Sequence, residues 1–209
     1  MRKPVLGTRL HRMQGLLFAE QVGDAGESSY FLSVNRVTQK MYAAVAGQNP
    51  SILVCDDNAV NFVNWFDAVS FCEKLSQISG EGPSMWKYRL PSEQEWCRGV
   101  ANATIRQSSA DPADIEDSKS KFRIPHGDTG CCDELKYVEN MGFWEWCQDW
   151  DGLSGHGKEP GEEQLSRRAV RGASWLYPTE LFPFPSRLTV HPSDRSVDIG
   201  FRVVAEKIN

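Results

Sequence analysis

The stretch RLTVHPSDRSVDIGFR, residues 187–202, carries the information that decides the fold. An arginine opens it, another closes it and a third stands at position 195, with a mixed set of residues between them. The closing GFR continues into VVAE, and this run of aromatic and β-branched residues is typical of a strand. The stretch therefore has two interpretations: the wall of a catalytic site, or a frame around residues that are free to differ.

The composition of the whole chain indicates a folded globular protein with an aromatic core. The 209 residues are 40% hydrophobic and 24% charged, with seven tryptophans and ten phenylalanines. This length suits a single domain over residues 1–209, with an N-terminal extension at 1–30 and loop insertions at 101–136 and 151–166. The net charge of −5 provides no field that would attract nucleic acid, so we expect no nucleic-acid partner.

No segment of the sequence indicates a membrane span. The first residues, MRKPVLGTRLHRMQGLLFAEQVG, lack the apolar run of a secretory signal. No stretch approaches the roughly 18 apolar residues of a membrane helix. We therefore expect a soluble chain without a span. A binding role would place it at the cell surface or outside the cell, with the cytoplasm as the alternative.

The six cysteines do not form a metal-binding pattern. They contain no CxxC pair, and no histidine lies at ligand spacing from another ligand. We expect buried thiols with at most one or two disulfides, and no metal or other cofactor. The set is Cys55, Cys72, Cys97, Cys131, Cys132 and Cys147.

Local signals predict three helices. Thr38 is an N-cap candidate and Gly47 a C-terminal stop, which gives a helix over 39–46. In NWFDAVSFCEKLSQISG, residues 64–80, apolar residues recur at helical spacing, and we expect them to face the core; they are Phe66, Val69, Phe71, Cys72, Leu75 and Ile78. Ser92 and Glu95 form a capping box that opens a short helix with Trp96 facing inward. FLSVNRV, residues 31–37, and the final GFRVVAE predict strands.

Four segments, taken in order, resemble the formylglycine-generating-enzyme family, the sulfatase-modifying-factor domain. They are VTQKMYAAVAGQNPS (37–51), VNFVNWFDAVSFCEKLS (60–76), YRLPSEQEWCRGVA (88–101), and GFWEWCQDW (142–150) with RAVRGASW…PSDRSVDIGFRVV (168–204). The resemblance spans residues 37–204. It implies an α+β domain with a C-type-lectin-like fold, few helices, short strands and much loop.

The resemblance also implies what an enzyme of this family would need. Its enzymes hold copper(I) between two cysteines of the carboxy-terminal segment, and copper(I) prefers such soft thiolates. The corresponding positions fall near Thr179 and Phe184, and no cysteine follows Cys147. The asparagine of the family's calcium motif is Gly142 here. We therefore expect no catalytic residues, no copper and no enzyme activity.

A second branch of the family, the variable proteins of diversity-generating retroelements, has the layout seen here. RGASW at 171–175 is followed by mixed residues, Arg187, Pro192, Arg195 and IGFR. The resemblance implies a variable segment over 171–202 that binds a protein or other macromolecular ligand. Large apolar side chains in a segment rich in proline support such a surface if they are exposed. The expected ligand-binding residues are Leu176, Tyr177, Leu181, Phe182, Phe184, Leu188, Val190, His191, Ser196, Val197 and Asp198.

The arginines of this segment are expected to be scaffold. Their planar, multiply donating side chains suit ties from loops to carboxylates and carbonyls. Glu145, Asp149 and Asp151 of WEWCQDWD are the expected partners. The full set of expected scaffold residues is Arg171, Trp175, Arg187, Arg195 and Arg202.

Two alternatives stay open at this stage. One is an enzyme that uses Cys147 or another thiol, or a metal shared with a partner domain. The other is a structural or assembly module that uses the same fold to bind one fixed partner. The missing carboxy-terminal cysteine pair counts against the first alternative, while the sequence of one chain does not separate the second from a variable binding protein.

Overall fold

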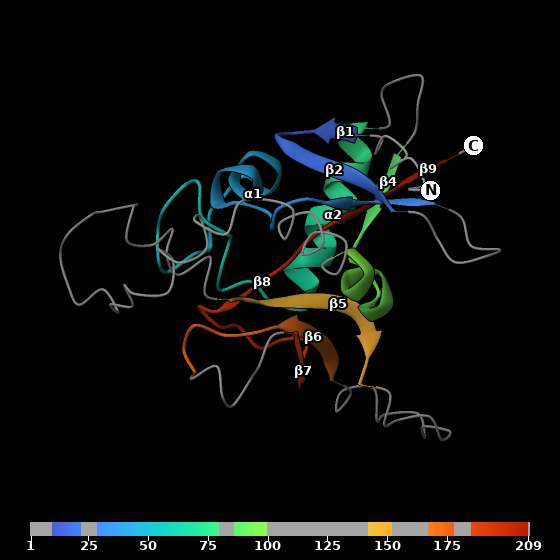
Figure 1. The fold of residues 1–209 in the computed structure, drawn as a ribbon. Helices are drawn as coiled ribbons and strands as arrows, with labels where there is room; N and C mark the ends of the chain where they lie inside the picture. Colours follow the sequence, from blue (N-terminus) through green and yellow to red (C-terminus); the bar gives the residue numbers. More distant parts are fainter. Residues whose placement is uncertain are drawn as a thin grey trace, which may run out of the picture.

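The computed structural model describes residues 10–21, 29–79, 86–99, 142–151, 167–177 and 185–208. These residues form two β-sheets with helices packed beside them (Figure 1). The predicted α+β class is confirmed. The expected loop at 101–136 and all of 151–166 after Asp151 lie outside the described residues.

The first sheet has five strands in the order β1-β2-β3-β9-β4. Their bounds are Leu10–Met13, Leu16–Gln21, Tyr30–Ser33, Val204–Lys207 and Trp86–Arg89. The strands β3 and β9 match the two predicted from FLSVNRV and GFRVVAE, and they pair with each other, Leu32 opposite Val204. Residues 10–21 supply β1 and β2, so this part of the expected N-terminal extension belongs to the sheet. Leu16, Phe18 and Ala19 of β2 are buried, which places this strand against the core.

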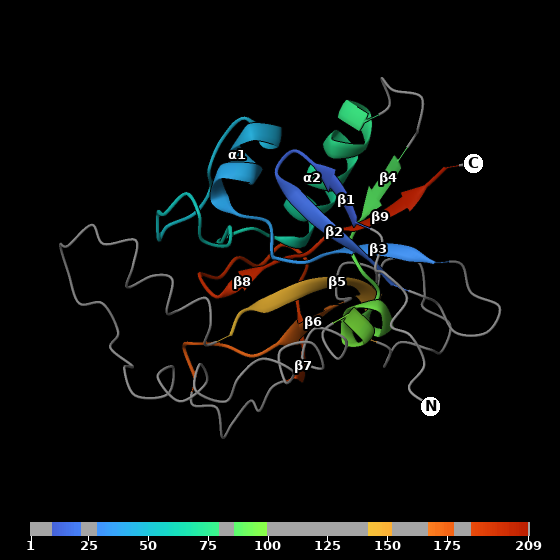
Figure 2. The same cartoon turned by 45° about the horizontal axis from the view of Figure 1, so that its top comes forward.

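Helix α1, Gln39–Ala46, has the predicted bounds and caps. The Thr38 side chain accepts a hydrogen bond from the Met41 N–H, and Gly47 ends the helix in the left-handed conformation with φ 87°. Helix α2, Trp65–Ser79, lies beside α1 and β4 (Figures 1 and 2).

The core face of α2 differs from the predicted one in two of its residues. Phe71, Cys72 and Leu75 are buried as expected, but Phe66 and Ile78 are 53% and 41% exposed. The helix turns about 100° per residue. A buried stripe centred on Phe71, Cys72 and Leu75 therefore leaves Phe66 and Ile78 at its margins. Ala68, a small residue that the apolar pattern did not include, is buried in their place.

A third helical stretch covers residues 93–99 and begins with the predicted capping box. The Ser92 N–H donates to Glu95 Oε2 at 2.8 Å, and the Glu95 N–H donates to Ser92 Oγ at 3.2 Å. Trp96 faces inward and is 1% exposed. The box thereby fixes the end of the helix that points toward the second sheet.

The second sheet has four strands in the order β7-β6-β5-β8. Their bounds are Ser186–Val190, Arg168–Gly172, Trp144–Trp150 and Ile199–Gly200. Its buried residues Trp144, Trp146 and Val170 share one core with Phe18 and Phe71. A strand at 186–190 was not expected in a segment so rich in proline, and β7 forms because it lies at the edge, where only one neighbour is needed.

Candidate functional site

The frame around residues 171–202 is built on one buried carboxylate. Glu145 of β5 is 1% exposed and accepts hydrogen bonds from Arg36 Nε, Arg202 Nε and Trp96 Nε1 at 2.7–2.8 Å. Burial by itself raises the pKa of Glu145, but the charges of Arg202 and Arg36 and the bond from Trp96 outweigh it, and the pKa is lowered. Arg202 also donates to the Val34 carbonyl. The Arg202–Glu145 pair matches the prediction, whereas Arg36 was missed.

A second carboxylate joins the edge strand β7 to its neighbour β6. Arg171 of β6 and Arg187 of β7 are cross-strand partners, an arrangement of like charges that is unfavourable on its own. Glu93 bridges them: its Oε2 accepts from Arg171 Nε at 2.8 Å and from Arg187 Nε at 2.7 Å, and its Oε1 accepts from Arg187 Nη2 at 2.9 Å. Glu93 was not among the expected partners. Its bond is the main cause that raises the pKa of Arg187, and the charges of the expected partners Asp151 and Asp149 add to this rise. The Asp151 carbonyl also accepts a bond from Arg187 Nη2 at 3.2 Å.

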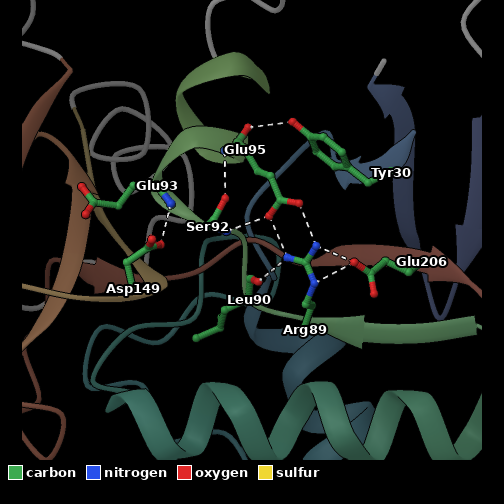
Figure 3. A network of polar contacts seen from close by, with 8 residues as sticks. All are labelled: Tyr30, Arg89, Leu90, Ser92, Glu93, Glu95, Asp149 and Glu206. Carbon is green, nitrogen blue, oxygen red and sulfur yellow. Dashed lines mark hydrogen bonds and ion pairs between the residues drawn. The ribbon is translucent and has the colours of Figure 1, made fainter. Parts of the chain in front are cut away.

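Glu93 reaches the strands because the capped helix starts beside them. Figure 3 shows the Glu93 N–H donating to Asp149 Oδ2, at 2.7 Å. On the other side of Ser92 in this view, Arg89 binds the carboxylates of Glu95 and Glu206. Neither the capping box nor strand patterning shows which strands the helix will meet. The sequence signal for Glu93 is only its place in the first turn, where an acidic residue is favourable.

Arg195 and Trp175 attach the segment 171–202 to residues earlier in the chain. Arg195 forms an ion pair with Asp67 at the start of α2 and donates to the Phe62 carbonyl at 3.0 Å. Trp175 is half-buried and packs against Ala59 and Phe143. All four expected scaffold arginines thus bind carboxylates within the chain.

The expected ligand-binding residues differ in exposure. Leu176, Tyr177 and Leu188 are 44%, 51% and 37% exposed. The first two lie on the loop after β6, and Leu188 lies on β7 opposite buried Val170, at the open margin of the core. His191, Ser196 and Val197 are half-exposed. We call these six residues the candidate surface.

Two expected ligand-binding residues occupy other environments. Val190 is half-buried and packs against the core, although it lies two residues after Leu188 and therefore on the same face of β7. Asp198 is 3% exposed and accepts hydrogen bonds from two serines. The Asp198 side chain is therefore not open to a ligand, and that of Val190 is open only in part. Leu181, Phe182 and Phe184, with Thr179, lie outside the described residues.

The sequence matches the family described as "Sulfatase-modifying factor enzyme 1-like domain" over residues 16–124 and 139–207. The chain belongs to this family. No curated protein matches the sequence.

Two solved structures are similar to this family member. Treponema denticola variable protein 1 shares 20% of its residues at a TM-score of 0.56, over 97% of this chain and 99% of that one. CarF shares 17% at a TM-score of 0.48, over 89% of each chain. The first likeness confirms the C-type-lectin-like fold expected from the four motifs.

The described thiols of this sulfatase-modifying-factor domain are poorly placed for chemistry. Cys147, the thiol that the enzyme alternative named, is completely buried, and burial raises its pKa well above the ordinary value. Cys55 and Cys72 are buried and Cys97 is half-buried, all as free thiols. Within the described ranges, no three histidine, cysteine or acidic side chains gather into a metal site. Among the same residues, no helix is both long and apolar enough to span a bilayer.

A depression of about 580 Å³ is lined by residues of α2, β5, β6 and the capping box. One of its walls is the guanidinium of Arg168, stacked between Trp65 and Trp150 with Cζ 3.8 and 3.3 Å from the ring centroids. Burial lowers the pKa of Arg168 to about 10. Sequence reasoning missed this stack, because its three members come from α2, β5 and β6 and share no motif.

Replacing Glu93 with glutamine should lower the free energy of unfolding by about 1–2 kcal/mol, since two like charges then face each other without a carboxylate. The measurement is urea unfolding at neutral pH. In the Glu93→Gln background, Arg187→Met should recover part of the loss, because it removes one of the two charges. A full-sized loss with no such recovery would contradict the bridging role.

Proposed function

We propose that this protein is a non-enzymatic ligand-binding protein that displays a changeable surface on a C-type-lectin-like frame. The observation that carries the proposal is the exposure of Leu176, Tyr177 and Leu188 in a segment whose arginines all bind carboxylates of the chain. Its fold is that of a solved variable protein from Treponema denticola, which supports the comparison with variable proteins. The ligand proposed is a protein or another macromolecule.

The proposal is supported by the separation between the scaffold arginines and the residues of the candidate surface. The arginines take their partners from Glu93, Glu145 and Asp67, which lie outside the variable segment. Side chains of the candidate surface can therefore change without removing an ion pair. Surface substitutions away from such contacts usually change stability little, whereas exposed aromatic and aliphatic groups contribute much of the binding energy of protein interfaces.

The single variants Tyr177→Ala and Leu188→Ala should each change the free energy of unfolding by less than about 1 kcal/mol. Trp146→Ala is the buried control and should cost about 3–5 kcal/mol. Thermal unfolding followed by circular dichroism measures all three. If either surface variant loses as much stability as the control, that residue belongs to the core and not to a binding surface.

A displayed library tests the binding function itself. Leu176, Tyr177, Leu188 and His191 are randomised together, and clones are selected for binding to hen lysozyme as a defined protein target. We expect folded, lysozyme-specific clones, because the ion pairs of the frame do not involve these side chains. A library randomised at buried Ala169 and Val170 is the matched control and should yield none. Failure of the first library to give folded binders would overturn the proposal.

The neighbouring DNA distinguishes a variable protein from a module with one fixed partner. A near-copy of the coding segment for residues 170–202 that differs only at adenines, beside a gene for a reverse transcriptase, is the expected finding. Its absence would support the fixed-partner alternative and leave the binding surface in place.

A further inference from the structure

We propose that Asp198 is a positioning residue that holds the two halves of the candidate surface in one fixed arrangement. The inference rests on the proposed function, because it concerns the same surface. It also changes the role of Asp198 from a ligand contact to a support beneath the surface.

The side chain of Asp198 bridges two segments that are more than twenty residues apart in the chain. Its Oδ2 accepts from Ser174 Oγ at 2.5 Å, a bond that spans 24 positions. Its Oδ1 accepts from the hydroxyl of Ser196. A carboxylate offers acceptors only and has two oxygens, so each oxygen holds one of the two segments.

The chain of hydrogen bonds continues to the exposed apolar residues. The oxygen of Ser174 accepts from the Leu176 N–H at 3.0 Å while its own hydroxyl proton goes to Asp198. Asp198 thereby fixes the rotamer of Ser174, and Ser174 fixes the backbone on which Leu176 and Tyr177 stand. On the other side, the carbonyl of Ser196 accepts from the Phe62 N–H at 2.9 Å.

The support is itself tied to the core sheet. The Asp198 carbonyl accepts from the N–H of Trp144, the first residue of β5, at 2.9 Å. Asp198 and Ser174 are each 3% exposed, so the bond between them lies where water competes little and its geometry is well defined. A surface held in this way loses little conformational entropy when a ligand binds.

Amide hydrogen exchange on the unliganded full chain tests the positioning role. In Asp198→Ala, the Leu176 amide should exchange about tenfold faster, since its acceptor Ser174 is no longer held. The Val204 amide in β9 should keep its rate. Asp194→Ala is the matched control: it removes the same charge from the exposed turn nearby and should leave the Leu176 rate unchanged.

Uniform acceleration at Leu176 and Val204 would overturn the inference, because it would show only a general loss of stability. An unchanged Leu176 rate would overturn it as well. If Asp198→Ala does not fold, the double variant Ser174→Ala with Ser196→Ala removes the same bridge with a smaller loss of volume, and the same two amides are compared.

A second readout uses single-domain antibodies selected on the wild-type chain as shape probes. Ser193 is an exposed residue of the turn that follows β7. Alanine substitution sorts the antibodies into clones that need both Tyr177 and Ser193 and clones that need Ser193 alone. Asp198→Ala should weaken the first group about tenfold or more and the second group less. Equal effects on the two groups would contradict the inference. These probes need no natural ligand, so they can support the positioning role of Asp198 even if the lysozyme selection fails. In the same way, the lysozyme selection can support the binding function even if the antibodies contradict the role of Asp198.

Discussion

Replacing Glu145 with glutamine should lower the free energy of unfolding by about 3–5 kcal/mol, the largest loss expected from any single charge in the described residues. Glu145 is buried and is the common partner of Arg36, Arg202 and Trp96. Glutamine keeps the shape but leaves two guanidinium groups without a counter-charge. Urea unfolding at pH 7 measures the change. Glu73→Gln, an exposed glutamate on α2, is the control and should change little.

The effect of Glu145→Gln should depend on pH in a defined direction. The folded-state pKa of Glu145 is lowered from its ordinary value of 4.5. The stability it contributes is therefore fully present above about pH 4.5 and is lost as the pH falls through the folded-state pKa. The difference between wild type and variant should be constant from about pH 6 to 8, where carboxylates stay ionised, and should shrink in acid. A difference that grows as the pH falls would contradict the assigned role.

Features set by neighbouring residues could be predicted from the sequence. The bounds of α1 follow from Thr38 and Gly47, and the capping box of Ser92 and Glu95 is formed as expected. The order of the four motifs predicted the family and its fold. In each case the signal lies within a few residues, or in a pattern already specific to one family.

Features set by distant contacts could not be predicted in the same way. Nothing near Arg171 and Arg187 in sequence indicates that their partner is Glu93, 78 and 94 positions away. Asp198 lies in a variable-looking stretch, and only the strand β8 that follows it shows why its side chain turns inward toward Ser174. Phe66 fitted the helical pattern, but the placement of α2 against α1 and β4 leaves it exposed.

The candidate surface could be predicted only in part, because the exposure of some of its residues depends on distant contacts. Exposure at Leu176 and Tyr177 follows from the turn that ends β6, which the motif RGASW suggests. Val190 has similar chemistry and lies on the same face of β7 as Leu188, but it packs against the core, whereas Leu188 is 37% exposed. Composition therefore indicates that a segment is a surface, while the packing around each side chain determines which of them lie open.

Replacing Gly172 with alanine should cost about 3–5 kcal/mol, since two independent penalties meet at this residue. Its φ of +130° is a conformation that side chains rarely adopt. A Cβ there would lie 2.2 Å from the carbonyl oxygen of Phe143, so β5 and β6 would have to separate at the point where the chain leaves for Leu176 and Tyr177. Thermal and urea unfolding measure the loss.

Gly47→Ala separates the two penalties. Gly47 has a φ of +87°, but a Cβ there would meet nothing within 4 Å, so this variant should cost only about 1 kcal/mol from backbone strain. The excess at Gly172 then measures how tightly β5 and β6 approach each other. If the two variants cost the same, the close approach of the strands contributes nothing, and the exit of the variable segment would owe its position to Asp198 and the arginines alone.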